Sequence, residues 1–321
     1  MGIAPISSDT YARVVLPLTA ELWSDKRPLD RYVADFKEVA ASPYGKRSFK
    51  TLAVFERDQI TVSCKRYERT IHVGSKTLQG AGIGALFTPP HLRGRGFASA
   101  FLGAFLDREK QAGTDVTYLF SDIHPAFYQN LGFRELPSRL ITMRADSIAM
   151  RRISVETPTE RDWPAVYKCF DALESRRPWG FSRTPTVWSW IRLKNRHHAA
   201  AGHGQPVHLV TRRANRVSAY VYGQRQPLAD ALVIHEFGFS DEHGYQALPS
   251  LLRSAAGDLR RIIGWLPPDV ARDALPQGSV RKRKDAIFMI APLSSAAKLL
   301  FSQETASTPS AGDRIWITDH I

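Results

Sequence analysis

A basic, glycine-containing segment with the chemistry to hold a phosphate lies near residue 90. An apolar stretch ends at Thr88, and Pro89-Pro90, the turn Arg93-Gly94-Arg95-Gly96 and a helical pattern of apolar residues follow in series. Glycines let backbone N–H groups approach a phosphate closely, and the start of a helix favours negative charge. The spacing therefore predicts a strand, an anion-binding turn and a helix, with a pyrophosphate as the bound anion.

A second chemistry-bearing segment, Phe127-Tyr128-Gln-Asn-Leu131-Gly132-Phe133, follows downstream. With Pro90 in front of it, Arg93-x-x-Gly96-x-Ala98 resembles the acyl-CoA signature of the GNAT acetyltransferases, and the second segment resembles their Tyr-x-x-Leu-Gly-Phe motif. The order and spacing of the two motifs agree with that family, and the resemblance covers about residues 10–145.

The resemblance implies acetyl transfer from acetyl-CoA to a primary amine by direct attack, with no metal. In that family, strand-four backbone groups pair with the pantetheine arm, and the glycine turn cradles the pyrophosphate. A solvated turn is the alternative for Arg93 and Arg95. The implied cofactor-binding residues are Leu86, Phe87, Thr88, Arg93, Gly94, Arg95, Gly96, Phe97, Ala98, Ser99 and Ser121.

Two groups are candidates for the proton transfers. The resemblance assigns Tyr128 as the general acid that protonates the leaving thiolate, whereas a core aromatic covering the cofactor is the alternative. In the enhanced-intracellular-survival (Eis-like) branch, the terminal carboxylate is the general base, which here implies Ile321. That branch ends in an aromatic residue rather than isoleucine, and an edge strand completing the second sheet is the alternative for this segment.

Acidic residues are candidates for binding the amine. Asp122 either orients the amine or caps the next helix, and Asp25 and Asp319 are expected near the acceptor entrance together with Asp30. His124 is a weaker candidate for a base. The resemblance leaves the acceptor open between an aminoglycoside-like amine and a peptide or protein lysine.

The elements that position these residues follow from apolar periodicity. Residues 28–41 read as a helix, residues 51–56 and 60–69 as a hairpin, and residues 78–88 as a strand. Three glycines in that strand, at 80, 82 and 84, indicate that another backbone or a ligand approaches it. A helix to about residue 113, a strand at 116–121, a short helix at 126–131 and a strand at 133–142 complete the first half.

The second half repeats this order with little sequence identity. Its predicted elements are helices at 159–173, 185–194 and 246–256, and strands at 207–212, 217–223, 231–239, 260–265 and 286–290. The segment Ser240–Gly244 is acidic where the first half has its basic turn, so no second cofactor is expected. Trp179, Phe181, Trp188 and Trp190 are predicted either to pack in the core or to wall an acceptor pocket.

The predicted fold class is therefore α/β (α+β). It consists of two tandem GNAT-like domains, each a mixed, mostly antiparallel sheet flanked by helices, with the second degenerate. The catalytic domain is expected at residues 1–145 and the degenerate domain at 146–301. Residues 302–321 are expected to be a connector, flexible over 302–312, and an aromatic tail that docks toward the active site.

Composition narrows the class of protein. The net charge of +13 is spread over both halves without interleaved aromatics, which suits anionic cofactors and does not favour nucleic acid. No stretch is long and apolar enough for a membrane span, and two distant cysteines suit a reducing, cytoplasmic setting as buried thiols. The histidines at 197, 198 and 203 show no metal-ligand pattern. The alternative function is a non-catalytic acyl-CoA-binding sensor or assembly protein, and the oligomeric state is left open, with a homo-oligomer as one option.

Overall fold

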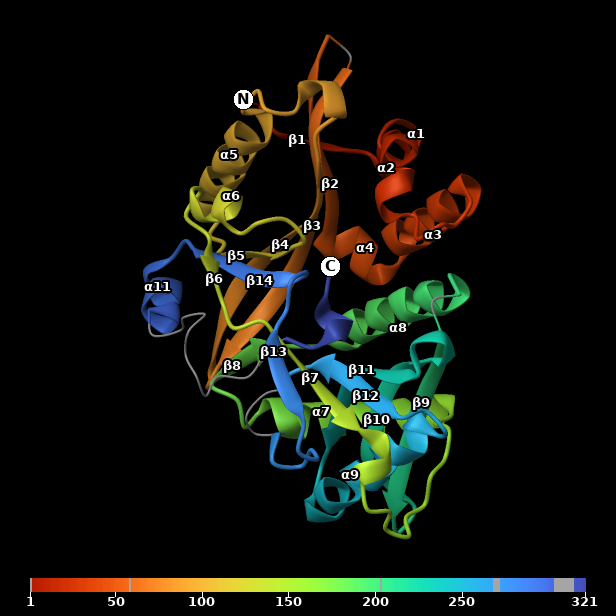
Figure 1. The fold of residues 1–321 in the computed structure, drawn as a ribbon. Helices are drawn as coiled ribbons and strands as arrows, with labels where there is room; N and C mark the ends of the chain where they lie inside the picture. The colour runs from red at the N-terminus through yellow and green to blue at the C-terminus, as the bar shows by residue number, and fades with distance from the viewer. Residues whose placement is uncertain (1, 58, 203, 268–271, 303–314) are drawn as a thin grey trace.

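Two β-sheets, each flanked by helices, make up the computed structural model, which describes residues 2–57, 59–202, 204–267, 272–302 and 315–321 (Figure 1). This architecture confirms the predicted fold class. None of the helices in these ranges has both the length and the apolar character needed to cross a membrane. The predicted connector at 302–312 lies almost entirely outside the described residues.

The first sheet has the strand order β1-β2-β3-β4-β5-β14-β6, and β8 pairs with β3. The pairing is antiparallel except between β4 and β5, which run parallel. The strands are β1 (Ala4–Ile6), β2 (Phe49–Glu56), β3 (Gln59–Val73), β4 (Lys76–Phe87), β5 (Val116–Ser121), β6 (Arg134–Glu135), β8 (Trp179–Phe181) and β14 (Ile287–Pro292).

Helices cover both faces of this sheet. On one face, α5 (Phe97–Gln111) buries Phe101 and Phe105 against Val62 and Ile83, because these apolar residues recur at helical spacing. On the other face, four helices pack their aromatic residues against β2 and β3. They are α1 (Ser8–Val14), α2 (Leu16–Trp23), α3 (Leu29–Ala41) and α4 (Pro43–Ser48), while α6 (Ala126–Gln129) follows β5.

The second sheet has the order β13-β7-β12-β11-β10-β9, and its one parallel pair within the described residues is β11 with β12. The strands are β7 (Arg139–Arg144), β9 (Gln205–Arg213), β10 (Arg216–Gln226), β11 (Ala231–Phe239), β12 (Arg261–Trp265) and β13 (Ser279–Lys282). The helices of this half are α7 (Trp163–Glu174), α8 (Pro185–Ala200), α9 (Glu242–Ala256) and α11 (Ser295–Phe301). Short 3₁₀ turns are η1 (Pro90–Leu92), η2 (Ala145–Ser147), η3 (Glu160–Asp162), η4 (Pro227–Ala229) and η5 (Ile317–Asp319).

The two sheets exchange strands. β14, from near the end of the chain, pairs with β5 in the first sheet, and β7, from the first half, pairs with β12 in the second. The order expected from the sequence placed each of these strands in the opposite unit, and that placement is wrong. The apolar pattern of a short strand reports which face is buried but not which strand lies beside it.

The tail, residues 315–321, runs between the two sheets, and the C-terminus lies near the middle of the molecule (Figure 1). Ile315 and Trp316 are each 3% exposed, and the Trp316 ring packs edge-on against Phe237. The Trp316 indole N–H also donates to the carboxylate of Glu174 at 3.2 Å. These contacts pack residues 315 and 316 of the tail against the second half of the chain.

Candidate active site

The first sheet opens where β4 and β5 stop pairing. The parallel register joins Gly80–Ile83 to Val116–Leu119, whereas β4 continues to Phe87. One extra residue in β4, with Ala85 at a φ of 49°, forms a bulge in its pairing with β3. The bulge follows the last residue pair of β4 with β5, so the β5 side of the β4 end is left to pair with another molecule.

A cavity of about 1220 Å³ lies at this opening. Its walls come from α2, α3, β3, the end of β4, the start of α5, the loop after β5, α6, α8 and the tail. The structure therefore brings most of the predicted site residues together. Those that line the cavity are Asp25, Leu86, Phe87, Thr88, Arg93, Gly94, Gly96, Phe97, Ala98, Ser99, Asp122, Tyr128 and Ile321, whereas Arg95, Ser121 and Asp319 are not among its lining residues.

The start of α5 is open to an anion. Gly94 and Gly96 have φ angles of 77° and 79°, which disfavour other residues, and no protein atom would meet a methyl group at either position. No side chain caps this helix, and its first turn contains no acidic residue. The Arg93 side chain donates to the carbonyl oxygen of Thr88 at 3.2 Å, which holds the arginine beside the opening.

Tyr128 reaches the cavity from α6. It is 9% exposed and packs edge-on against the rings of Phe127 and Phe133, at centroid distances of 4.9 and 5.9 Å. Burial raises the pKa of Tyr128 to about 12, and the nearby Asp122 adds to this effect. The phenol therefore carries its proton at neutral pH and is able to donate it.

The residues after β5 have different local partners. The Ser121 hydroxyl donates to the carbonyl oxygen of Ile123 at 2.8 Å, and Ser121 is 1% exposed. Asp122 accepts the N–H of Ala286 at 2.9 Å and does not cap α6. His124 instead accepts the N–H of Ala126 at 3.2 Å through Nδ1 and is exposed.

Ile321 lies against the glycines of β4. A methyl group at Gly82 would lie 2.4 Å from Cδ1 of Ile321, and one at Gly84 would lie 3.4 Å from its carbonyl carbon. The sequence predicted that a backbone or ligand approaches this strand, and the tail of the same chain does so. Ile321 also lines the cavity, beside Tyr67 of β3.

Asp319 is placed in a buried ion network rather than at the acceptor entrance. It is 2% exposed, and its carboxylate accepts from Arg69 of β3 and from Arg183, each at 2.7 Å. Arg183 also pairs with Glu236 of β11 at 2.6 Å. The network therefore joins the tail to both sheets, and Asp319 is neutralised by arginines before any amine could reach it.

Two lysines that the motifs did not point to line the cavity. Lys194 of α8 donates to the backbone carbonyl oxygens of Thr318, at 2.8 Å, and of His320, so it holds the tail in place. Burial lowers the pKa of Lys194 to about 7, although Asp319 opposes this shift. Lys65 of β3 is the second lysine that lines the cavity. Neither lysine belongs to one of the two motifs, so their place at the cavity is seen only in the folded chain.

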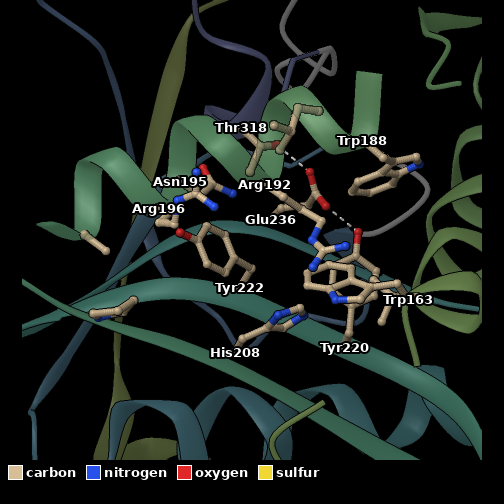
Figure 2. Close-up of a pocket in the computed structure, with 14 residues that line it drawn as sticks. Trp163, Trp188, Arg192, Asn195, Arg196, His208, Tyr220, Tyr222, Glu236 and Thr318 are labelled. Carbon is tan, nitrogen blue, oxygen red and sulfur yellow. Dashed lines mark hydrogen bonds between the residues drawn. The ribbon is translucent and has the colours of Figure 1, made fainter. Parts of the chain in front are cut away.

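A smaller cavity of about 240 Å³ lies in the second half, and the rings of Trp163, Trp188, Tyr220 and Tyr222 form part of its wall (Figure 2). Figure 2 shows the carboxylate of Glu236 between the hydroxyls of Tyr220 and Thr318, both of which donate to it. Burial lowers the pKa of His208 to about 4, so its ring is neutral there. Of the predicted aromatic cluster, Trp188 lines this small cavity and Trp190 the large one, whereas Trp179 and Phe181 are buried in the core.

The helix of the second half that corresponds to α5 already has an anion at its start. The Asp241 carboxylate caps α9 by accepting the N–H of Gly244 at 2.8 Å and the hydroxyl of Ser218. A methyl group at Gly244 would lie 2.2 Å from the carbonyl oxygen of Ser218, so the turn is closed. This geometry supports the prediction that no second cofactor binds here.

Comparison with known proteins finds a family match within the first half of the chain. Residues 9–136 match the model of the acetyltransferase (GNAT) domain. No curated protein matches the chain. The first half therefore has the sequence character of a GNAT domain, in agreement with the open strands and the glycine turn.

Solved structures share the fold of the whole chain. A conserved protein of unknown function from Enterococcus faecalis V583, a probable N-acyltransferase, has a TM-score of 0.72 at 15% identity and covers 93% of this chain and 74% of its own. Eis1 from Mycobacterium abscessus has a TM-score of 0.62 at 15% identity, over 93% and 75%. A tandem GNAT protein from the clavulanic acid biosynthesis pathway has a TM-score of 0.51 at 14% identity, over 91% and 98%. At these identities the likeness concerns the fold.

Proposed function

We propose that this chain is an N-acyltransferase that moves the acetyl group of acetyl-CoA to a primary amine by direct attack. The observation that carries the proposal is the uncapped start of α5 at the cavity where β4 and β5 separate. The helix start suits a pyrophosphate, and the separated strands suit an extended pantetheine arm. Coenzyme A contains both groups. The match of residues 9–136 to the GNAT domain supports the same assignment.

The glycine turn is proposed to bind the pyrophosphate. Its left-handed residues Gly94 and Gly96 aim backbone N–H groups outward, and the first-turn N–H groups of Phe97, Ala98 and Ser99 point the same way along the helix axis. The Arg93 guanidinium lines the same wall and adds positive charge. Arg95 is exposed beside it and is proposed to contribute through its charge alone.

The end of β4 is proposed to hold the pantetheine arm. Leu86, Phe87 and Thr88 line the cavity beyond the last pair with β5, so their backbone groups can pair with amides of the arm as an added strand would. The Thr88 hydroxyl is buried and lacks a hydrogen-bond partner among the described residues. Ser121 bonds within its own loop and does not line the cavity, so its predicted contact with the cofactor stays a proposal.

Tyr128 is proposed as the general acid. The amine nitrogen attacks the thioester carbonyl carbon, the C–S bond breaks, and the thiolate takes the phenol proton of Tyr128. Because burial keeps this phenol protonated, the proton is available over the whole neutral range. Positioning of the two reactants in a closed cavity supplies most of the remaining rate enhancement.

The amine must lose a proton before or during attack, and Ile321 is the proposed base. With Ile321 as the last residue, its α-carboxylate would lie beside Gly84 on the acceptor face of β4. Asp25 and Asp122 also line the cavity and are proposed to contact the acceptor side. The acceptor itself, an aminoglycoside-like small molecule or a peptide lysine, stays open at this level.

A screen of primary amines with acetyl-CoA, read as release of free thiol, tests the proposal. We expect Tyr128→Phe to lower kcat by about 10²- to 10⁴-fold, the range of general acid–base contributions, with acetyl-CoA affinity preserved. Tyr245→Phe, the same change on α9 in the second half, serves as the matched control and should leave kcat unchanged.

Two outcomes would count against this scheme. Normal thiol release by Tyr128→Phe with a good acceptor would remove the acid assignment. Tight coenzyme A binding without turnover of any amine would favour the alternative, a non-catalytic acyl-CoA sensor or assembly protein, which has no use for the Tyr128 proton.

A further inference from the structure

We infer that the acceptor amine carries a carboxylate and that the side chain of Lys65 binds it on the β3 wall of the large cavity. The inference rests on the proposed function, because it concerns the acceptor end of the same cavity. It gives the chemical class of the amine acceptor, which the proposed function leaves open.

Lys65 projects from β3 toward aromatic residues of α1 and α3. It pairs in register with Gly84 of β4, so it shares a face with Tyr67 two residues on. Its ammonium lies 5.5 Å from the ring centroid of Phe36, and 5.9 Å from those of Tyr11 and Tyr32. The charge therefore lies among aromatic rings, two of which, Tyr32 and Phe36, also line the cavity.

The other cationic side chains of the cavity already have partners. Arg27 pairs with Asp35 at 2.8 Å, Arg93 donates to Thr88, and Lys194 donates to tail carbonyl oxygens. Among the described residues that line the cavity, Lys65 is the one lysine or arginine with neither a hydrogen bond nor an ion pair.

An ammonium in this position is incomplete without an anion. Burial lowers the pKa of Lys65 to about 8, and repulsion from Arg27 adds to this effect. Aromatic faces stabilise a cation only in part, whereas a carboxylate supplies a full opposite charge and a charge-assisted hydrogen bond. A ligand carboxylate within hydrogen-bond distance of Lys65 would restore the charged form that burial penalises.

Asp25, Asp35 and Asp319 do not supply that anion, because arginines already pair with them. Asp35 is shared between Arg27 and Arg31, and Asp25 lies 3.6 Å from Arg27. Asp319 is held by two buried arginines. Each of these three carboxylates has an arginine partner, whereas the Lys65 ammonium has no acidic partner among the described residues. A ligand carboxylate is therefore the anion that this cation lacks.

The rest of the chamber indicates the body of the acceptor. Trp23, Phe49, Tyr67 and Trp190 line the cavity around Lys65, and the Trp190 ring stacks on Tyr44 behind it. Walls of this kind bind an apolar or aromatic body. The acceptor class is therefore a primary amine on an apolar or aromatic body that ends in a carboxylate.

Matched pairs of amines test the inference. The panel contains 4-(aminomethyl)benzoate, ω-amino acids of increasing length and the aromatic α-amino acids, each beside its primary amide, which keeps the shape and removes the charge. Calorimetric binding and, with acetyl-CoA, kcat/KM are measured for each pair. The wild-type chain should prefer at least one carboxylate over its amide by about 10- to 100-fold, the range for one hydrogen-bonded charge.

Substitution of Lys65 should remove that preference selectively. We expect Lys65→Met to lower binding and kcat/KM for the carboxylate by about 10- to 100-fold and to leave the amide within about twofold, while Lys65→Arg keeps most of the preference. Lys50→Met, the same change at an exposed position of the neighbouring β2, is the control and should alter neither. Coenzyme A affinity should be the same in all four proteins.

The readouts separate the two proposals. Equal use of carboxylates and amides, unaffected by Lys65→Met, in a protein that transfers acetyl groups would overturn the inference and leave the proposed function intact. Binding of none of the carboxylates would overturn it as well. Lys65-dependent carboxylate binding in a protein that fails to bind coenzyme A would instead sustain the inference and overturn the acetyltransferase assignment.

Discussion

Asp319 shows how one residue can be fixed by charge alone. Burial by itself would raise its pKa, but Arg183 and Arg69 lower it to about 2. Because this pKa is below the ordinary value of 3.8, the folded state favours the charged carboxylate. The resulting stabilisation is complete above about pH 4 and is lost as the pH falls through about 2.

Removing this carboxylate should be costly. We expect Asp319→Ala to lower the free energy of unfolding by about 3–5 kcal/mol, because Arg69 and Arg183, whose side chains are 0% exposed, lose this carboxylate and Glu236 is left to pair with Arg183. Chemical denaturation measures the change. Asp107→Ala, at an exposed position of α5, is the matched control and should stay within about 0.5 kcal/mol. A loss below about 1 kcal/mol for Asp319→Ala would show that the network relaxes.

At the scale of elements, the glycines and the bulge of β4 position two parts of the site. Its glycines weaken the strand but leave room for the tail, whose last described residue packs where side chains would otherwise stand. The same strand carries a bulge in its pairing with β3, just beyond its last residue pair with β5. One element therefore positions the cofactor slot at its end and the tail across its middle.

A methyl group in the middle of β4 should displace the tail. At Gly82 it would lie 2.4 Å from Cδ1 of Ile321 and 2.6 Å from Cζ of Tyr118. We expect Gly82→Ala to destabilise the fold by about 1–3 kcal/mol and to lower acetyl transfer, measured by thermal unfolding and by thiol release. Gly103→Ala in α5, where a methyl meets nothing within 4 Å, should be neutral or mildly stabilising. Equal effects of the two changes would contradict a tail held by close packing.

The sequence predicted the positions of helices and strands better than it predicted which strands pair with one another. Long periodic segments such as α3, α5 and β11 were found within a few residues, whereas the three-residue β8 and the short α1 and α2 were missed because their patterns are too short. In the site, the glycine turn and Tyr128 could be predicted because each belongs to a short motif of neighbouring residues. Lys65 and Lys194 could not be found, since strands and helices far apart in the chain bring them to one cavity.

The two halves of the chain are joined by exchanged strands as well as by contacts between side chains. β14 completes the first sheet, β7 belongs to the second, and the network of Asp319 links both to the tail. The Trp190 and Trp188 rings, on opposite sides of α8, stack on Tyr44 and Tyr167 in the two halves. Neither half contains all the strands of its own sheet.

A fragment of residues 1–145 should therefore not fold by itself. It lacks β14, so β5 is left with an open edge and the apolar residues of the first core lose Ile287 and Met289. We expect no cooperative unfolding transition by circular dichroism for this fragment, and recovery of one when residues 146–321 are co-expressed. Cooperative unfolding of the isolated fragment would show that the exchange is dispensable.

The exchanged strand also sets an order of events during synthesis. Ser121 pairs with Ile287, so β5 is made long before the strand that covers its edge. Until residue 292 has left the ribosome, the growing chain presents an unpaired apolar strand to its surroundings, a condition that favours aggregation and chaperone binding. The domain that is translated first is thus the one whose sheet closes last.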